Sequence, residues 1–190
     1  MRKKRKKHRL GSRSKTWPTQ RERLTIRENR HTFAHSARAT LRDAYRAYTQ
    51  FRRSTSISET RLAWHLCFAN LRRVGHLLKS KDASRSSFLA RAIEEAWLRS
   101  KSQAAAGHSV LDFIITERNT LLKDGITSLI VEDANENRAP TSPSCAVIWQ
   151  CQRHSAKEVV ASCLRWWDAE LDTIEKRATD LKAIKKLPAS

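Results

Sequence analysis

The sequence predicts an all-α protein, a bundle of about five helices with a small β-hairpin insertion before the last helix. Three observations support this fold class. Four glycines and four prolines in 190 residues are too few for a turn-rich all-β design and favour long helices. Apolar residues recur at spacings of three and four along several stretches, which is the periodicity of amphipathic helices. Two short β-prone runs lie close together within residues 126–154.

The first eighteen residues differ from the rest of the chain because they are strongly basic and carry few apolar side chains. Their lysines and arginines begin with Arg2, Lys3, Lys4, Arg5, Lys6, Lys7 and Arg9. Such a segment buries too little apolar surface to offset the entropy lost on ordering, so residues 1–18 are expected to form a disordered arm. A single helical domain over residues 19–186 and a short tail over residues 187–190 complete the predicted organisation.

The first predicted helix begins just after Pro18, where Thr19 and Glu22 form a capping-box pattern. Its apolar stripe consists of Ile26, Phe33, Ala37, Leu41, Ala44, Tyr48 and Phe51. The opposite face is rich in arginine and is expected to be solvated or to extend a basic surface. These arginines are Arg21, Arg23, Arg27, Arg38, Arg42 and Arg46.

The second predicted helix starts at a capping box formed by Ser56 and Glu59 and runs to about Lys79. Its apolar residues are spread around the helix axis, so we expect it to be the most buried helix. They are Leu62, Trp64, Leu66, Phe68, Leu71, Val74 and Leu78. Gly75 lowers the helix propensity, and a close crossing with another helix would explain its presence.

The third predicted helix spans residues 86–102, and the fourth spans residues 111–125. The fourth helix has a strong apolar face formed by Leu111, Ile114, Ile115, Leu121 and Leu122. Arg118 falls on or beside this stripe, which suggests that the arginine has a structural or functional role. Gly125 is expected to end the helix in the left-handed conformation, which glycine adopts at little steric cost.

The predicted hairpin insertion has two strands joined by a long connection. One strand contains residues 129–131 and the other contains residues 146–149, both rich in β-branched side chains. The connection over residues 133–144 is rich in Asn, Pro and Ser. We expect a β-hairpin with a mobile loop here.

The last predicted helix begins at another capping-box pattern, formed by Ser155 and Glu158. One face is continuously apolar and should pack against the other helices. It contains Val159, Cys163, Trp167, Leu171, Ile174, Ala178 and Leu181.

A zinc site is the main metal hypothesis that the sequence raises. Cys145, Cys151, His154 and Cys163 lie close together, but their spacing lacks the short Cys-x-x-Cys knuckles of structural zinc sites. The prediction is therefore no metal, and no motif indicates another cofactor. Neither a secretory signal nor an apolar run of membrane-spanning length is seen, so reduced thiols and a cytoplasmic location are expected, or a nuclear one in a eukaryote.

The charge balance points to a polyanionic partner. The chain has 38 Lys and Arg against 19 Asp and Glu, a formal net charge of +19. A positive field of this strength favours nucleic acid over a membrane surface. The basic arm together with Arg118 and Lys123 is predicted to contact phosphates, with affinity that depends on salt and little on base sequence.

A family resemblance adds to this interpretation. The runs Trp64–Val74 and Phe113–Asn119, together with Trp97 between them, resemble the core of HEPN-like helical domains (higher eukaryotes and prokaryotes nucleotide-binding). In that family an Arg, commonly followed by Asn, precedes a His on one helix, and dimers bring two such motifs together for metal-independent RNA cleavage. The resemblance implies that Arg118 and Asn119 start this motif. It also favours RNA over DNA as the partner and a homodimer as the assembly.

The chain departs from the family pattern where the histidine is expected, because Lys123 stands there. A lysine is almost wholly protonated near neutral pH and is a poor base, although it can bind phosphate. The sequence therefore favours a nucleic-acid-associated protein with a catalytically inactive or degenerate HEPN-like module and no catalytic residue. One alternative is a HEPN-like ribonuclease of a defence or toxin-antitoxin system, with Arg118, Asn119 and a histidine brought from elsewhere, such as His108 or His154.

A further alternative is a structural scaffold or interaction bundle whose charge serves solubility. In that case Arg118 would pair with Glu94, Glu95 or a backbone carbonyl inside the bundle, and Asn119 would cap or cross-link helices. This alternative has the same predicted fold but gives Arg118 and Asn119 no functional role.

Overall fold

The computed structural model describes residues 33–105, 109–125, 127–132 and 144–185. All of them belong to one unit, Thr32–Ser190. The basic arm, the predicted capping box at Thr19, His108, most of the connection over residues 133–144 and the last five residues lie outside the described ranges.

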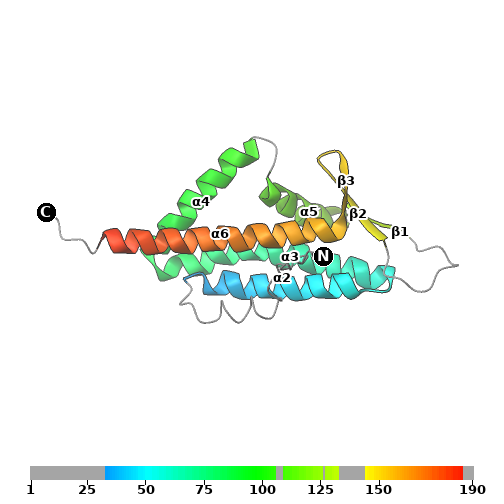
Figure 1. The fold of residues 1–190 in the computed structure, drawn as a ribbon, viewed down its shortest axis with the longest axis horizontal. Helices are drawn as coiled ribbons and strands as arrows, with labels where there is room; N and C mark the ends of the chain where they lie inside the picture. The colour runs from blue at the N-terminus through cyan, green and yellow to red at the C-terminus, as the bar shows by residue number, and fades with distance from the viewer. Residues whose placement is uncertain (1–32, 106–108, 126, 133–143, 186–190) are drawn as a thin grey trace, which may run out of the picture. The chain divides into compact units, whose positions relative to one another are not determined.

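The predicted fold class is confirmed in this part of the chain. Its helices are α2 (His35–Arg53), α3 (Ile57–Leu77), α4 (Ser87–Ala105), α5 (Val110–Asp124) and α6 (Ala156–Ile184). Its strands are β1 (Leu129–Glu132), β2 (Ser144–Trp149) and β3 (Gln152–Ser155), and they precede the last helix as predicted. Figure 1 shows α2, α3 and α6 alongside one another, with α4 leaving α6 at an angle.

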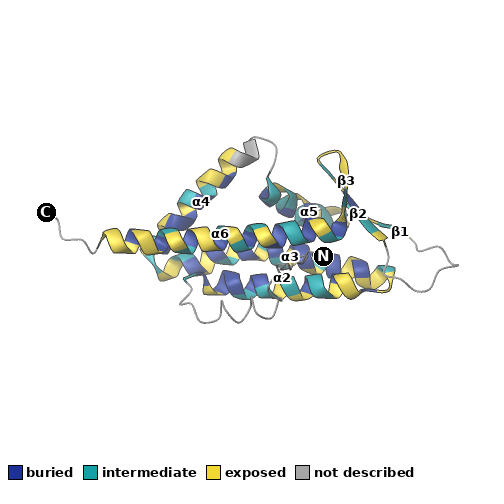
Figure 2. Cartoon of the chain, in the orientation of Figure 1, coloured by how far each residue is buried: buried dark blue, intermediate teal, exposed yellow. Residues whose placement is uncertain are grey.

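The core forms where α2, α3 and α6 meet, and α4, α5 and the sheet cover it. Its largest fully buried side chains are Trp64, Phe51, Phe68, Leu71, Leu89, Ile114, Leu164, Leu171, Ile174, Val74, Val147 and Val160. The predicted apolar face of α6 is buried along its whole length. Figure 2 shows buried and exposed positions alternating around α2 and α6, as expected for helices that each bury one face. No helix among the described residues is both long and apolar enough to cross a membrane.

Side chains near the helix termini satisfy several of the free backbone groups. The predicted capping box at α3 is confirmed: Ser56 Oγ accepts the Glu59 N–H at 3.2 Å, and Glu59 Oε2 accepts the Thr55 N–H at 3.2 Å. Gly125 ends α5 with φ of 65°, as predicted, and its N–H donates to the Leu121 carbonyl. The capping box predicted for α6 is wrong, because the Ser155 side chain makes no cap hydrogen bond although the helix begins at Ala156.

Helix α3 is buried on one side, and not around its whole axis as the sequence suggested. Leu62 is 61% exposed and Leu66 is 41% exposed. The close crossing predicted from Gly75 is present, because a Cβ atom there would lie 3.0 Å from Cη2 of Trp167 on α6. After Leu77 the chain continues as a π-helical turn, Leu78–Asp82, and a 3₁₀ turn, Ala83–Arg85, before α4.

Arg38 contradicts the prediction that it lies on a solvated arginine face. Its residue is 8% exposed, and Nη2 lies 2.6 Å from both Asp172 and Glu175 of α6. Nη1 lies 3.7 Å from Asp168. The spacing of residues within α2 places Arg38 away from the apolar stripe. It does not predict partners such as these carboxylates, which lie more than 120 residues further along the chain. The ion pairs join α2 to α6.

The insertion contains one strand that the sequence did not predict. The sheet has the order β1-β2-β3 and is antiparallel throughout, with Val147 paired to Leu129 on one side and His154 on the other. β2 and β3 are joined by Gln150 and Cys151, which both have positive φ, at 53° and 60°. Such a turn usually uses Asn or Gly, so its residues gave no sequence indication of a second hairpin.

Candidate nucleic-acid interface

The residues predicted as the functional centre of the fourth helix do not form a buried site. Arg118 on α5 is half-buried, and its Nη1 donates to Oδ1 of the adjacent Asn119 at 3.1 Å. Lys123 is exposed in the last turn of α5. Of the partners that the scaffold alternative offered to Arg118, Glu95 is not bonded to it, because Glu95 accepts from Arg177 at 2.7 Å and from Arg91 at 3.2 Å.

The buried polar group of α5 is Glu117, one residue before the predicted site. Its carboxylate accepts hydrogen bonds from Trp64 Nε1 at 2.6 Å, from the Thr127 hydroxyl at 2.5 Å and from the Ser128 hydroxyl at 2.6 Å. These contacts join α5 to α3 and to the start of β1. With Glu117 turned inward, the buried face of α5 is Leu111, Ile114 and Glu117.

The apolar stripe predicted for α5 is therefore wrong in its last turn. Leu121 is half-buried and Leu122 is 63% exposed. Arg118 lies beside Glu117 in the chain and cannot share its inward face. A glutamate does not contribute to an apolar periodicity, so the sequence pattern did not indicate that Glu117 is buried. It indicated the neighbouring Arg118 instead.

The structure places an open cavity of about 480 Å³ between α2, the sheet and the first turns of α6. Its lining combines rings, cations and hydroxyls with one carboxylate. The lining residues are Tyr48, Trp149, His154, Lys157, Glu158, Val159, Ala161, Ser162 and Arg165. Neither Arg118 nor Lys123 is among them.

The aromatic wall of this cavity is the outer end of a chain of rings that begins in the core. Successive centroids are 4.5 to 5.7 Å apart from Phe51 through Trp64, Phe68 and Phe113 to Trp149. The Trp149 and His154 rings follow at 6.0 Å, inclined by 58°. Because Trp149 is anchored on Phe113, its position at the cavity is fixed by core packing.

The two cations in the lining, Lys157 and Arg165, both come from α6, and Arg52 of α2 lies outside the lining beside Tyr48. The Arg52 guanidinium lies 5.9 Å from the centroid of the Tyr48 ring. Burial raises the pKa of Tyr48, while the positive charges of Arg52 and Arg165 oppose that shift. The Tyr48 hydroxyl donates to the Lys157 carbonyl at 3.1 Å, which ties α2 to the first turn of α6. The positive charges thus lie on the α6 side of the cavity and beside the Tyr48 ring.

The sequence did not predict this cavity, although several of its lining residues were assigned other roles. Tyr48 was assigned to an apolar stripe, Trp149 to a strand, and His154 to a zinc hypothesis or a distant catalytic role. Lys157 and Arg165 were not selected at all. Their spacing of eight residues on one helix places both cations on one face, and that was the available indication.

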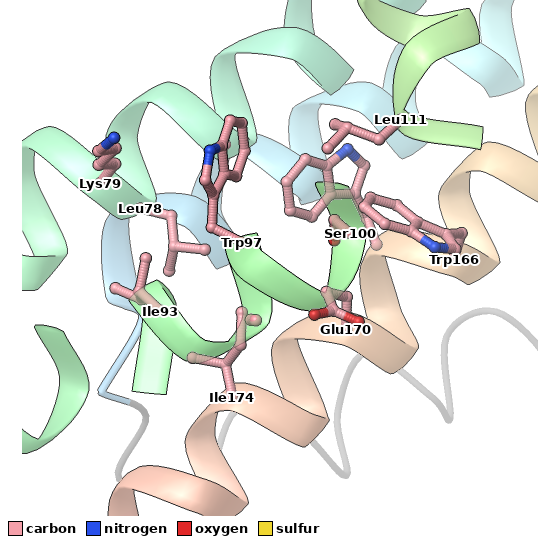
Figure 3. Close-up of a pocket in the computed structure, with 12 residues that line it drawn as sticks. Leu78, Lys79, Ile93, Trp97, Ser100, Leu111, Trp166, Glu170 and Ile174 are labelled. Carbon is pink, nitrogen blue, oxygen red and sulfur yellow. The ribbon is translucent and has the colours of Figure 1, made fainter. Parts of the chain in front are cut away.

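A second cavity, of about 20 Å³, lies between α3, α4, α5 and α6 and has room for about one water molecule. Figure 3 shows the labelled side chains of Trp97, Trp166 and Leu111 among those that line it. The Trp167 Nε1 atom is buried without a hydrogen-bond partner. This cavity is too small for a nucleotide.

The residues of the zinc hypothesis are not gathered into a site. Cys163 is buried in the core on α6, and burial raises its pKa to about 12. Cys145 is half-buried on β2 and Cys151 is exposed in the β2–β3 turn. Within the described ranges no group of three or more His, Cys, Asp or Glu side chains could hold a metal ion.

A comparison of this chain with protein-family models, with curated proteins and with solved structures finds no match.

Proposed function

We propose that this chain is a nucleic-acid-binding protein with a catalytically inactive HEPN-like module, and that RNA is its preferred partner. The observation that supports the proposal best is the open cavity beside the sheet, whose lining contains aromatic rings together with two cations of α6. Cations neutralise phosphates, and aromatic rings stack on bases. The preference for RNA rests on the HEPN-like resemblance alone.

The distribution of charge along α6 also supports this proposal. Toward its C-terminal end, carboxylates pair with arginines of other helices: Asp172 and Glu175 with Arg38, and Glu170 with Arg99. At its N-terminal end, Lys157 and Arg165 line the cavity. The positive end of the helix dipole adds to this field, which favours an anion beside the first turn of α6.

The basic arm extends the same chemistry beyond the described residues. Arg2, Lys3, Lys4, Arg5, Lys6, Lys7 and Arg9 contribute to the net charge of +19. A run of this kind binds phosphates without reading bases, and its contribution falls steeply as salt displaces it. The bundle would then supply the specific contacts and the arm the general affinity.

The test is salt-dependent binding of a mixed-sequence 20-nucleotide RNA, followed by fluorescence anisotropy between about 50 and 300 mM salt. We expect affinity to fall steeply with salt, and deletion of residues 2–15 to weaken binding further. Lys157→Gln and Arg165→Gln should each reduce the salt slope by about one. Lys176→Gln, an exposed position on α6 outside the cavity, is the matched control. Absent or salt-independent binding would contradict the proposal.

A further inference from the structure

We infer that the cavity between α2, the sheet and α6 is a seat for an unpaired base, so that the protein prefers single-stranded over double-stranded nucleic acid. This inference rests on the proposed function and deepens it. Phosphate contacts alone would not distinguish the two forms, because both present the same charged backbone. A preference for single strands would therefore have to come from the aromatic rings of the cavity.

The first argument is the chemistry of the lining. Trp149, His154 and Tyr48 supply ring surface from two strands and a helix to one hollow. A base inside a duplex has both faces covered by its neighbours, whereas an unpaired base can stack on an aromatic side chain. The volume of about 480 Å³ falls within the range of about 300 to 1,000 Å³ that pockets for small molecules have.

The second argument is the placement of the cations beside the rings. Lys157 and Arg165 are eight residues apart on α6, which is about 12 Å along the helix axis. Ala161 lies midway between them on the same face, and its small side chain leaves room for a ligand. A strand lying along this face can keep its phosphates near the cations while one base turns toward Trp149 and His154.

The third argument is the rigidity of the ring wall. Trp149 packs on Phe113, with centroids 5.1 Å apart, and Phe113 packs on Phe68 of the core. A ring held in place loses little conformational freedom when a base stacks on it. The Ser162 hydroxyl and the Glu158 carboxylate, also in the lining, offer hydrogen bonds to the edges of the base.

The experiment compares the full chain binding a 20-nucleotide single-stranded RNA and the blunt 20-base-pair duplex of the same sequence, at about 150 mM salt. We expect tighter binding of the single strand. Trp149→Leu and His154→Ala should each lower single-strand affinity, about tenfold for the tryptophan. Duplex affinity should stay unchanged, because the bases of a duplex are already stacked on one another and do not use these rings. Trp149→Leu should also leave the salt slope unchanged, because tryptophan carries no charge.

Three variants separate stacking from general damage to the fold. Trp149→Phe keeps an aromatic ring and should restore most of the single-strand affinity that Trp149→Leu loses. His154→Ala changes a half-buried side chain on β3 and leaves the Phe113 contact intact. Trp97→Leu changes a half-buried tryptophan in the other cavity and should not alter the preference for single strands.

The outcomes distinguish this inference from the proposed function. Salt-dependent binding with equal affinity for single strand and duplex, or with equal losses in both for Trp149→Leu and His154→Ala, overturns the base seat and leaves nucleic-acid binding intact. Absence of binding to either form overturns both.

Discussion

At the scale of single residues, the environments of Arg38 and Arg118 differ from those that the sequence predicted. Arg38 was predicted on a solvated face and is buried among carboxylates of α6. Arg118 was predicted beside a buried stripe and bonds only to its chain neighbour Asn119 among the interactions described. The partners of Arg38 lie more than 120 residues away in sequence, and the face of α5 on which Arg118 lies is set by the distant contacts of Glu117, so periodicity within one helix contains no information about either.

The first prediction concerns Arg38. Arg38→Ala removes the buried guanidinium that pairs with three carboxylates of α6, so the free energy of unfolding should fall by about 3 kcal/mol. Urea unfolding followed by circular dichroism measures this loss. Arg46→Ala is the matched control, because Arg46 is 78% exposed and pairs with Asp43 within the same helix. Its loss should stay below about 0.5 kcal/mol, and losses of equal size would contradict the assignment.

The second prediction concerns Glu170. Burial raises the pKa of this carboxyl, and the Arg99 ion pair opposes the shift. The folded-state pKa of Glu170 therefore lies above the unfolded value of about 4.5, so the unfolded chain loses this proton first as pH rises. The free energy of unfolding falls as pH rises from the unfolded-state pKa through the folded-state pKa. Glu170→Gln should therefore raise Tm at pH 7 relative to wild type, with little change at pH 4.

Glu132→Gln is the control of opposite sign. The hydrogen bond and the charge of Arg153 lower the pKa of Glu132, so its carboxylate form stabilises the fold above the unfolded pKa. Its replacement should lower Tm slightly at pH 7. Thermal unfolding of both variants at pH 4 and pH 7 makes the comparison, and a decrease in Tm for Glu170→Gln at pH 7 would refute the role given to burial.

At the scale of elements, helix boundaries followed the sequence closely from α3 onward, whereas the predicted first helix does not run through Phe33, because α2 begins only at His35. The buried face of α6 was predicted correctly, whereas the faces of α3 and α5 were not. Ser56 and Gly125 act locally, through their own backbone neighbours, and their predicted roles are confirmed. Leu62 and Leu122 are exposed because no other element of the described chain covers them, which no local rule could foresee. β3 was missed because its turn uses Gln150 and Cys151 in place of glycine.

The third prediction concerns the crossing of α3 and α6. Gly75→Ala places a Cβ atom 3.0 Å from Cη2 of Trp167, which is buried and cannot move freely. Overpacking of this kind costs about 1 to 3 kcal/mol and outweighs the gain in helix propensity of about 1 kcal/mol. We expect a net destabilisation of about 1 kcal/mol in denaturant unfolding.

A double-mutant cycle checks the cause. In the Trp167→Phe background the added methyl group meets a smaller ring, so Gly75→Ala should become neutral or stabilising there. The same loss in both backgrounds would show that Trp167 is not the neighbour that requires glycine.

At the scale of the whole molecule, the question is whether the chain binds nucleic acid or also cleaves it. Carboxylates toward the C-terminal end of α6 pair with arginines of α2 and α4, while Lys157 and Arg165 nearer its N-terminal end line the cavity beside the sheet. Net charge alone predicts a polyanionic partner and says nothing about where it binds. The aromatic and cationic lining of the cavity is the observation that locates the proposed contact.

The fourth prediction concerns cleavage. With Lys123 where a HEPN-like motif has histidine, we expect no cleavage of RNA in the presence of a chelator. Arg118→Ala should leave the free energy of unfolding within about 1 kcal/mol of wild type, because its described hydrogen bond goes to its neighbour Asn119. Gel analysis of labelled RNA and urea unfolding measure the two effects.

Chelator-resistant cleavage that Arg118→Ala abolishes, with an intact fold, would establish the ribonuclease alternative instead. Unfolding of the Arg118→Ala variant without any cleavage by wild type would favour the scaffold alternative, in which the arginine is structural.

The sequence by itself determined the fold class, the helix boundaries from α3 onward, the buried face of α6 and the positive charge, because these depend on periodicity, capping and composition along one stretch of chain. Only the tertiary structure decided which charges are buried and which side chains meet at the cavity. Arg38 is buried because carboxylates of α6 pair with it, and Glu117 is buried with Trp64 as a hydrogen-bond donor. The cavity forms only where residues of α2, β2, β3 and α6 come together. Contacts between elements distant in sequence set these properties, and one chain's local pattern does not encode them.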